Sequence, residues 1–228
     1  MRMMRITINT FFIFLLLIVS PSLKAQEQDF QTRFGIDAEG DIIDDLAWGV
    51  KVQQRWRYNS SVNDRTLLQG EIEYSPLSFL SVGIGYRASF VDKQEDGLVY
   101  KQRFQGDLAL DHRIDRFKFT YRSRLQYGFD DFQTLYFVEG ESFTWRHRLA
   151  VKYYPFGLAL RPQASVEIFQ KVNAPDERGL DGIRYILGAE YLLSHQMSVG
   201  LDYIFNKEMN VSNPLTEHTL SASLSYEF

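Results

Sequence analysis

Arginine occurs at alternate positions in several short stretches of this sequence, and carboxylates recur with the same spacing in others. Arg55 and Arg57, like Arg122 and Arg124, are separated by one residue. Residues two apart in an extended chain point to the same side, so these guanidinium groups share one face. A guanidinium binds carboxylates and other oxyanions through parallel hydrogen bonds, so such a face can pair ions or recognise anions. The predicted charge network consists of Arg55, Arg57, Glu71, Glu73, Arg87, Arg103, Asp107, Arg122, Arg124, Arg146, Arg148, Arg161, Glu167, Arg184, Glu190 and Asp202.

Two interpretations of this network differ in function. If each charge finds a partner, the side chains form a ladder of ion pairs that fills a narrow interior, because a buried charge needs a partner. If arginine exceeds the acids locally, the interior keeps an electropositive constriction that selects anionic solutes. We favour the ladder and keep the constriction as the alternative.

Enzymatic chemistry finds little support in the four histidines. His112 and His195 fall in expected turns, and His147 and His218 fall on the apolar side of their segments, without a serine and an acid beside them. A bulge that shifted the register could bring His147 to the polar face. Cysteine is absent, and no paired histidines or phosphate-binding glycine loop occur. We therefore predict no catalytic residue, no metal site and no cofactor.

The elements that position the charged face are predicted to be β-strands. Between Leu46 and Tyr58, even positions hold Leu, Trp, Val, Val, Gln, Trp and Tyr, and odd positions hold Ala, Gly, Lys, Gln, Arg and Arg. A period of two indicates a strand whose two faces differ. The same alternation recurs in ten segments: 46–58, 66–74, 80–90, 98–110, 117–129, 143–153, 158–168, 183–191, 197–205 and 218–228.

The length and spacing of these segments favour a membrane barrel over a soluble sandwich. They run 9 to 13 residues, which is what a tilted strand needs to cross a bilayer. Short connections, such as Ser75–Pro76, alternate with longer polar ones, such as 59–64 and 130–141. The last segment alternates to the end through Leu224, Tyr226 and Phe228, which resembles the terminal signal read by the outer-membrane barrel-assembly machinery. The predicted fold is all-β: an antiparallel up-and-down transmembrane barrel of 10 to 12 strands.

The strand count cannot be fixed from the sequence. Two termini on the same side of a membrane require an even number of strands, which ten segments satisfy. The stretch 30–38 also alternates, however, and makes an eleventh candidate. Residues 26–45 are thus either an N-terminal extension or an extra strand, in which case a twelfth strand could lie in 135–138.

The first residues predict export. Arg2 and Arg5 precede an apolar run from Phe11 to Val19, and a small-residue site follows near Ala25. This is the pattern of a cleaved signal peptide, 1–25, with the barrel in 26–228. Without Arg2, Arg5 and Lys24, the 25 basic residues become 22 against 29 acidic ones, a net charge of −7. Nucleic acid is therefore not an expected partner; membrane lipid and the assembly machinery are.

Several segments resemble an uncharacterised outer-membrane β-barrel family of Bacteroidota, known only as a domain of unknown function. The resemblance lies in Gln54–Asn59, Gly85–Arg87, Trp145–Leu149, Arg161–Glu167 and Arg184–Tyr191. It implies a barrel in a Gram-negative outer membrane and supplies no catalytic residue. We expect a structural barrel or a narrow, porin-like passive pore. A barrel that binds partners through its longer loops is the alternative, and a lipid- or peptide-acting enzyme comes third.

Overall fold

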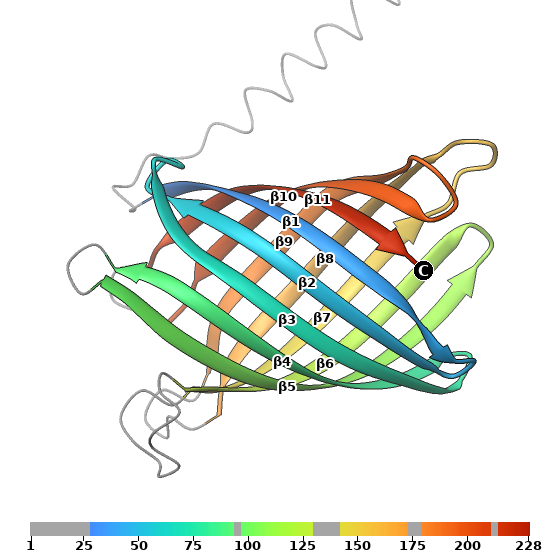
Figure 1. Ribbon diagram of the computed structural model, residues 1–228, viewed down its shortest axis with the longest axis horizontal. Helices are drawn as coiled ribbons and strands as arrows, with labels where there is room; N and C mark the ends of the chain where they lie inside the picture. Colours follow the sequence, from blue (N-terminus) through green and yellow to red (C-terminus); the bar gives the residue numbers. More distant parts are fainter. Residues whose placement is uncertain (1–27, 94–96, 130–141, 173–178, 211–213) are drawn as a thin grey trace, which may run out of the picture.

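The computed structural model describes residues 28–93, 97–129, 142–172, 179–210 and 214–228, and these form one closed barrel of eleven strands (Figure 1). Each strand is hydrogen-bonded to the one before and the one after it in sequence. Within these ranges, no helix is long and apolar enough to span a membrane. The strands are β1 (Gln28–Ile43), β2 (Leu46–Arg57), β3 (Val62–Leu77), β4 (Leu80–Lys93), β5 (Gly97–Ile114), β6 (Phe117–Phe129), β7 (Ser142–Tyr153), β8 (Leu160–Lys171), β9 (Leu180–Leu192), β10 (Met197–Glu208) and β11 (Thr216–Glu227).

The ten segments expected from the alternation correspond to β2 through β11. Some turns differ from the prediction. Ser75–Pro76 lies within β3, and the turn follows at 78–79; His112 lies within β5, and the turn follows at 115–116. The loop expected at 59–64 is a tight turn, because Tyr58, Asn59 and Ser60 adopt positive φ angles of 52°, 54° and 62°. Strand pairing extends β3 and β5 beyond the segments 66–74 and 98–110 that the side-chain alternation indicated.

The requirement for an even strand count is wrong for this chain. Residues 28–43 form β1, which pairs antiparallel with β2 on one side and parallel with β11 on the other. In an odd series of antiparallel neighbours, the first and last strands point the same way, so the closing pair must be parallel. Every edge is still paired, which is what closure requires. The proposed twelfth strand at 135–138 and the signal peptide at 1–25 lie outside the described residues.

The two ends of the barrel differ. We call the end with the connections 44–45, 78–79, 115–116 and 193–196 the turn end, and the opposite end the loop end. Because β1 runs parallel to β11, β1 starts at the loop end, and the chain finishes at the turn end (Figure 1).

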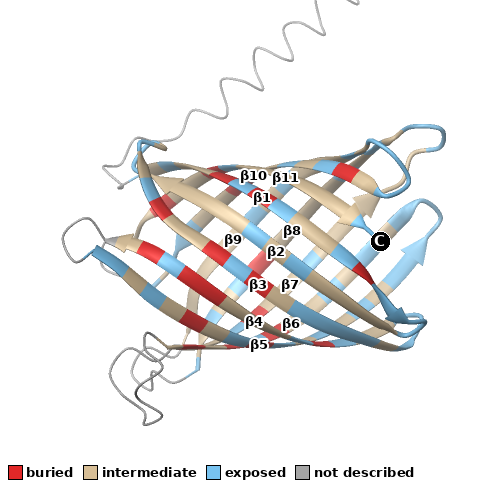
Figure 2. Ribbon diagram, in the orientation of Figure 1, coloured by how far each residue is buried: buried red, intermediate tan, exposed pale blue. Residues whose placement is uncertain are grey.

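Burial is the reverse of that in a soluble protein (Figure 2). The outer face carries large exposed apolar side chains, among them Ile84, Leu187 and Leu201, which are 67%, 67% and 53% exposed. The buried side chains are mostly polar or charged; Glu167 is 2% exposed and Arg124 is 7% exposed. The alternation therefore divides an apolar exterior from a polar interior.

Candidate functional site

The polar face of the strands encloses the barrel interior, which we call the lumen. Its main cavity has a volume of about 540 Å³ and extends from the middle of the barrel toward the loop end. Among its lining residues, twelve are arginine or lysine and two are acidic. The charged residues of its wall are Arg33, Lys51, Arg55, Arg65, Glu71, Arg87, Lys101, Arg103, Arg122, Arg124, Arg146, Arg148, Asp181 and Arg184.

Glu167 on β8 organises one side of the lumen. Arg146 on β7 donates from Nη2 to its Oε2 over 2.6 Å and from Nε to Oε1 over 3.1 Å. Arg122 and Arg184 each donate to the same carboxylate over 3.3 Å. Arg146 and Arg184 also stack on Phe169, with 4.7 and 4.8 Å from guanidinium carbon to ring centre. One buried carboxylate therefore holds three arginines from three strands.

Further acids hold neighbouring cations. Asp107 on β5 accepts a hydrogen bond from Nη2 of Arg124 over 2.8 Å and lies 4.0 Å from Nε of Arg122. Near the loop end, Asp64 accepts from Nε of Arg65 over 2.6 Å and lies 3.8 Å from Nε of Arg57. In this part of the lumen, ion pairs therefore link charged side chains within and between neighbouring strands.

Ion pairs continue toward the turn end. Glu190 on β9 lies 2.7 Å from Nζ of Lys152 and 3.5 Å from Nη1 of Arg161. Asp202 on β10 accepts a hydrogen bond over 2.8 Å from Gln163 on β8, although β9 lies between these strands. Gly188 on β9 pairs with both residues and leaves room for this bond, since a Cβ there would overlap the Asp202 carboxylate.

Five luminal arginines take no part in these ion pairs. Within the residues that the structure describes, Arg33, Arg55, Arg87, Arg103 and Arg148 form no ion pair with a carboxylate. Three of them donate to glutamines instead, as Arg55 does to Gln53 over 2.7 Å, Arg87 to Gln69 over 2.9 Å and Arg33 to Gln31 over 3.3 Å.

These arginines also face other arginines across the strands. Arg55 pairs in register with Arg33 on β1 and Arg65 on β3, and Arg87 pairs with Arg103 on β5. Like charges directly opposite each other destabilise a sheet. The main cavity is therefore electropositive, with arginines that form no ion pair with a carboxylate of the described residues.

The turn end has the opposite charge near β1 to β3. Glu71 and Glu73 on β3 are exposed, and so are Glu39 on β1 and Glu227 on β11. Glu71 accepts a hydrogen bond from Gln69 over 2.9 Å, and Glu73 has no ion pair within the described residues. On this side of the barrel, the lumen thus changes from acidic at the turn end to basic in the middle.

Several luminal charges were missing from the predicted network. Arg33 lies on the strand whose existence was left open. Asp64 and Arg65 lie at a bulge where β3 pairs with β2, which interrupts the period of two. Lys51 and Lys101 lie on the polar face of the expected strands 46–58 and 98–110, so the alternation alone could have placed them in the lumen.

Two of the histidines, His147 and His218, and the C-terminal residues of the predicted assembly signal lie on the outer face. Tyr121 and Tyr203 are within hydrogen-bond distance of Nδ1 of His147 and His218, over 2.8 and 2.6 Å. Phe228 packs against Trp48, with 5.7 Å between ring centres. Leu224, Tyr226 and Phe228 share the outward face of the last strand. Among the described residues, no three His, Asp or Glu side chains are grouped to hold a metal ion.

Comparison with known families gives a match over residues 30–216, to a family described as "Protein of unknown function (DUF2490)". The match covers most of the chain and most of the barrel, including the lumen. No curated protein matches the sequence.

Proposed function

Because the chain belongs to the DUF2490 family, whose description names no activity, we propose its function from the barrel itself: a narrow passive pore of a bacterial outer membrane that prefers small anions. The five luminal arginines that have no carboxylate partner in the described part of the chain carry this proposal. Because of these arginines, the wall of the lumen attracts anions, whereas a wall of balanced ion pairs would be neutral.

The exterior supports insertion into a membrane. Exposed apolar side chains of this size and number cover the outer face of all eleven strands, whereas a soluble monomer rarely exposes apolar patches larger than a few hundred Å². Strands of 12 to 18 residues are long enough for a tilted crossing of the hydrocarbon layer. An apolar exterior around a polar lumen is the arrangement of outer-membrane barrels.

The route to that membrane follows from the sequence. The expected signal peptide directs export, and Leu224, Tyr226 and Phe228 would be read by the barrel-assembly machinery. The partners are then outer-membrane lipid and that machinery, in a Gram-negative envelope such as that of Bacteroidota. Nucleic acid is not among the proposed partners, and no enzymatic activity is proposed.

The charges in the lumen favour selective passage of anions over a purely structural role. Removing an arginine from water without a carboxylate partner is costly, and placing it opposite a second arginine adds to the cost. An anion that enters the lumen offsets both the loss of hydration and the repulsion between facing arginines. Rings of arginine or lysine are a recurrent way in which pores select anions.

Conductance in a planar lipid bilayer tests the proposal. With a gradient of potassium chloride, we expect small unitary currents and a reversal potential displaced toward the equilibrium potential of chloride. Arg55→Gln combined with Arg103→Gln should reduce this displacement, because both remove unpaired charge from the main cavity. Arg161→Gln is the control: it removes a single luminal arginine, which is paired with Glu190, and its effect is compared with that of Arg103→Gln alone and of the double variant.

Two results would overturn the proposal. One is a barrel that inserts but passes no current, and the other is a reversal potential displaced toward potassium. Equal effects of the double variant and of the control would remove the special role of the unpaired arginines.

A further inference from the structure

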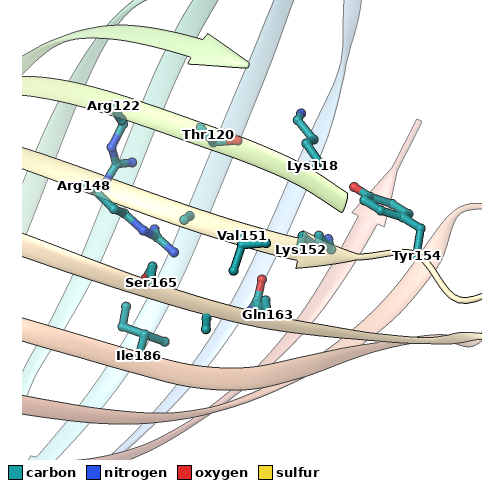
Figure 3. A pocket seen from close by; sticks show the side chains of 12 residues that line it. Lys118, Thr120, Arg122, Arg148, Val151, Lys152, Tyr154, Gln163, Ser165 and Ile186 are labelled. Carbon is teal, nitrogen blue, oxygen red and sulfur yellow. The ribbon is translucent and has the colours of Figure 1, made fainter. Parts of the chain in front are cut away.

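A second luminal cavity, of about 260 Å³, lies between β6, β7, β8 and β9 toward the turn end (Figure 3). Arg122 and Arg148 line both this pocket and the main cavity. The pocket is also lined by Lys118, Ala150, Lys152, Ser165 and Ile186. Its volume is below the usual range for drug-sized ligands, so it suits a small molecule.

Among the described residues, one cation of the pocket wall, Arg148, has no carboxylate partner. Lys118 lies 2.8 Å from Asp111, and Lys152 lies 2.7 Å from Glu190. Arg122 donates to Glu167. Arg148 pairs in register with Glu167 across β7 and β8 but forms no ion pair with it, because three other arginines occupy that carboxylate. Because Glu167 is shared by three arginines and Glu190 by Lys152 and Arg161, the wall keeps an excess of positive charge, which suits an anion.

Buried donors without partners point to where an anion would lie. Nε of Arg148, Nε of Arg122 and Oγ of Ser165 are buried and make no hydrogen bond to any residue that the structure describes. Ser165 pairs with Ala150, two residues beyond Arg148 on the same face of β7, a diagonal separation that a long side chain can span. Figure 3 shows the Arg148 side chain extending toward the strand that carries Ser165. A buried donor left unsatisfied is destabilising, and a carboxylate placed between these groups would accept from them.

Two apolar side chains flank Ser165 in the pocket wall, because Ala150 on β7 and Ile186 on β9 are its register partners. Both residues line the pocket, although the positions that face the lumen are otherwise mostly polar. Ile186 lies two residues from Arg184, which is part of the Glu167 cluster, so both occupy the inward face of β9. A purely inorganic anion would gain nothing from these apolar side chains, whereas an alkyl chain would bury surface against them.

The geometry points to this pocket as a binding site for a short-chain organic monocarboxylate. The carboxylate accepts from Arg148 and Ser165, and the alkyl chain packs against Ile186 and Ala150. The inference rests on the proposed function in one respect, because it names the class of anion that the lumen holds on its way through.

Isothermal titration calorimetry on the purified barrel in a maltoside detergent tests the site with butyrate, acetate and inorganic phosphate. Burial of a methylene strengthens binding about three- to fourfold, so we expect butyrate to bind about tenfold more tightly than acetate. Phosphate should bind more weakly than butyrate. Ile186→Thr should reduce the difference between butyrate and acetate.

The matched variants are Arg148→Gln and Arg103→Gln. Both remove a luminal arginine without an ion pair, but Arg103 lines only the main cavity. We expect Arg148→Gln to weaken butyrate binding at least tenfold and Arg103→Gln to change it less than twofold. Ser165→Ala keeps the charge and should weaken binding several-fold, which provides a second variant if Arg148→Gln does not fold. Heat-dependent gel mobility verifies the fold of each variant.

Tighter binding of phosphate than of butyrate, or equal losses in the two arginine variants, would overturn the inference in favour of a diffuse positive field. Failure of the proposed pore function can be distinguished from failure of the binding site, because butyrate binding is measured in detergent micelles and does not require conduction. A barrel that binds butyrate through Arg148 but carries no current would contradict only the pore.

Discussion

Glu167 is the residue on which the charge balance of the lumen depends most. It is 2% exposed and accepts hydrogen bonds from Arg122, Arg146 and Arg184. Glu167→Gln would leave three buried guanidinium groups around a neutral amide. Breaking a buried pair by removing one partner costs about 3–5 kcal/mol. We expect a loss of this size in the free energy of unfolding, measured by urea titration of tryptophan fluorescence in lipid vesicles.

Glu73→Gln is the control for this prediction. Glu73 is an exposed carboxylate that also belongs to the predicted network, and it has no ion pair within the described part of the chain. Its replacement should change the free energy of unfolding by less than about 0.5 kcal/mol. Similar losses in both variants would mean that the lumen responds to total charge and not to the contacts of Glu167.

At this scale, the sequence predicts which side chains face the lumen but not which of them pair. Parity depends only on the pleat of the strand, so Arg122, Arg148 and Glu167 could be assigned to one face from the alternation. Their partners depend on strand register and on rotamers. Arg148 therefore faces Glu167 without pairing with it, whereas Arg184 pairs with it from β9. Parity is lost where a bulge intervenes, as at Asp64 and Arg65.

Among the elements, β1 shows the limit of the period-two pattern. The alternation in 30–38 indicated a strand, but a strand does not specify its neighbour. Short connections, such as those at 44–45, 78–79 and 115–116, fix antiparallel pairing of the strands they join, since a short turn can only join adjacent strands. No connection joins β1 to β11, so their parallel register comes from closure of the barrel and could not be derived locally.

A disulfide across the seam between β1 and β11 would test this pairing. Phe34 and Ala222 are register partners, and the chain contains no cysteine, so Phe34→Cys with Ala222→Cys introduces the only two thiols. Register partners lie within the separation a disulfide can bridge. We expect mild oxidation of the folded barrel to protect both thiols from maleimide labelling until a reductant is added.

Phe34→Cys with Tyr226→Cys is the corresponding control. Tyr226 lies four residues further along β11, about 13 Å away at the rise of a strand, and this pair should remain open to labelling. Free thiols in both pairs would mean that residues 28–43 do not close the barrel and lie instead as the N-terminal extension left open by the sequence.

Across the whole molecule, charge is arranged along the barrel axis as well as between its faces. Exposed acids such as Glu39 and Glu73 lie toward the turn end, and the unpaired arginines lie from the middle toward the loop end. The division between apolar exterior and charged lumen was predictable, because period two sorts residues by face. The axial division was not, because it needs the stagger of every strand relative to its neighbours.

The exterior makes a final prediction about the intact barrel. Its exposed apolar side chains lie on every strand, so the folded chain should need detergent or lipid to stay dispersed, whereas heating should unfold it into a form of different gel mobility. We expect unboiled protein refolded in detergent to migrate separately from boiled protein and to give a β-type circular dichroism spectrum. The Glu167→Gln variant should convert at a lower temperature, because it loses luminal ion pairs that stabilise the folded barrel.

A folded, monomeric barrel that stays soluble after removal of detergent would contradict the proposed membrane location, since no partner would then cover the apolar face. The lumen would in that case be the interior of a soluble container for anions, and the binding of butyrate would be the property to pursue.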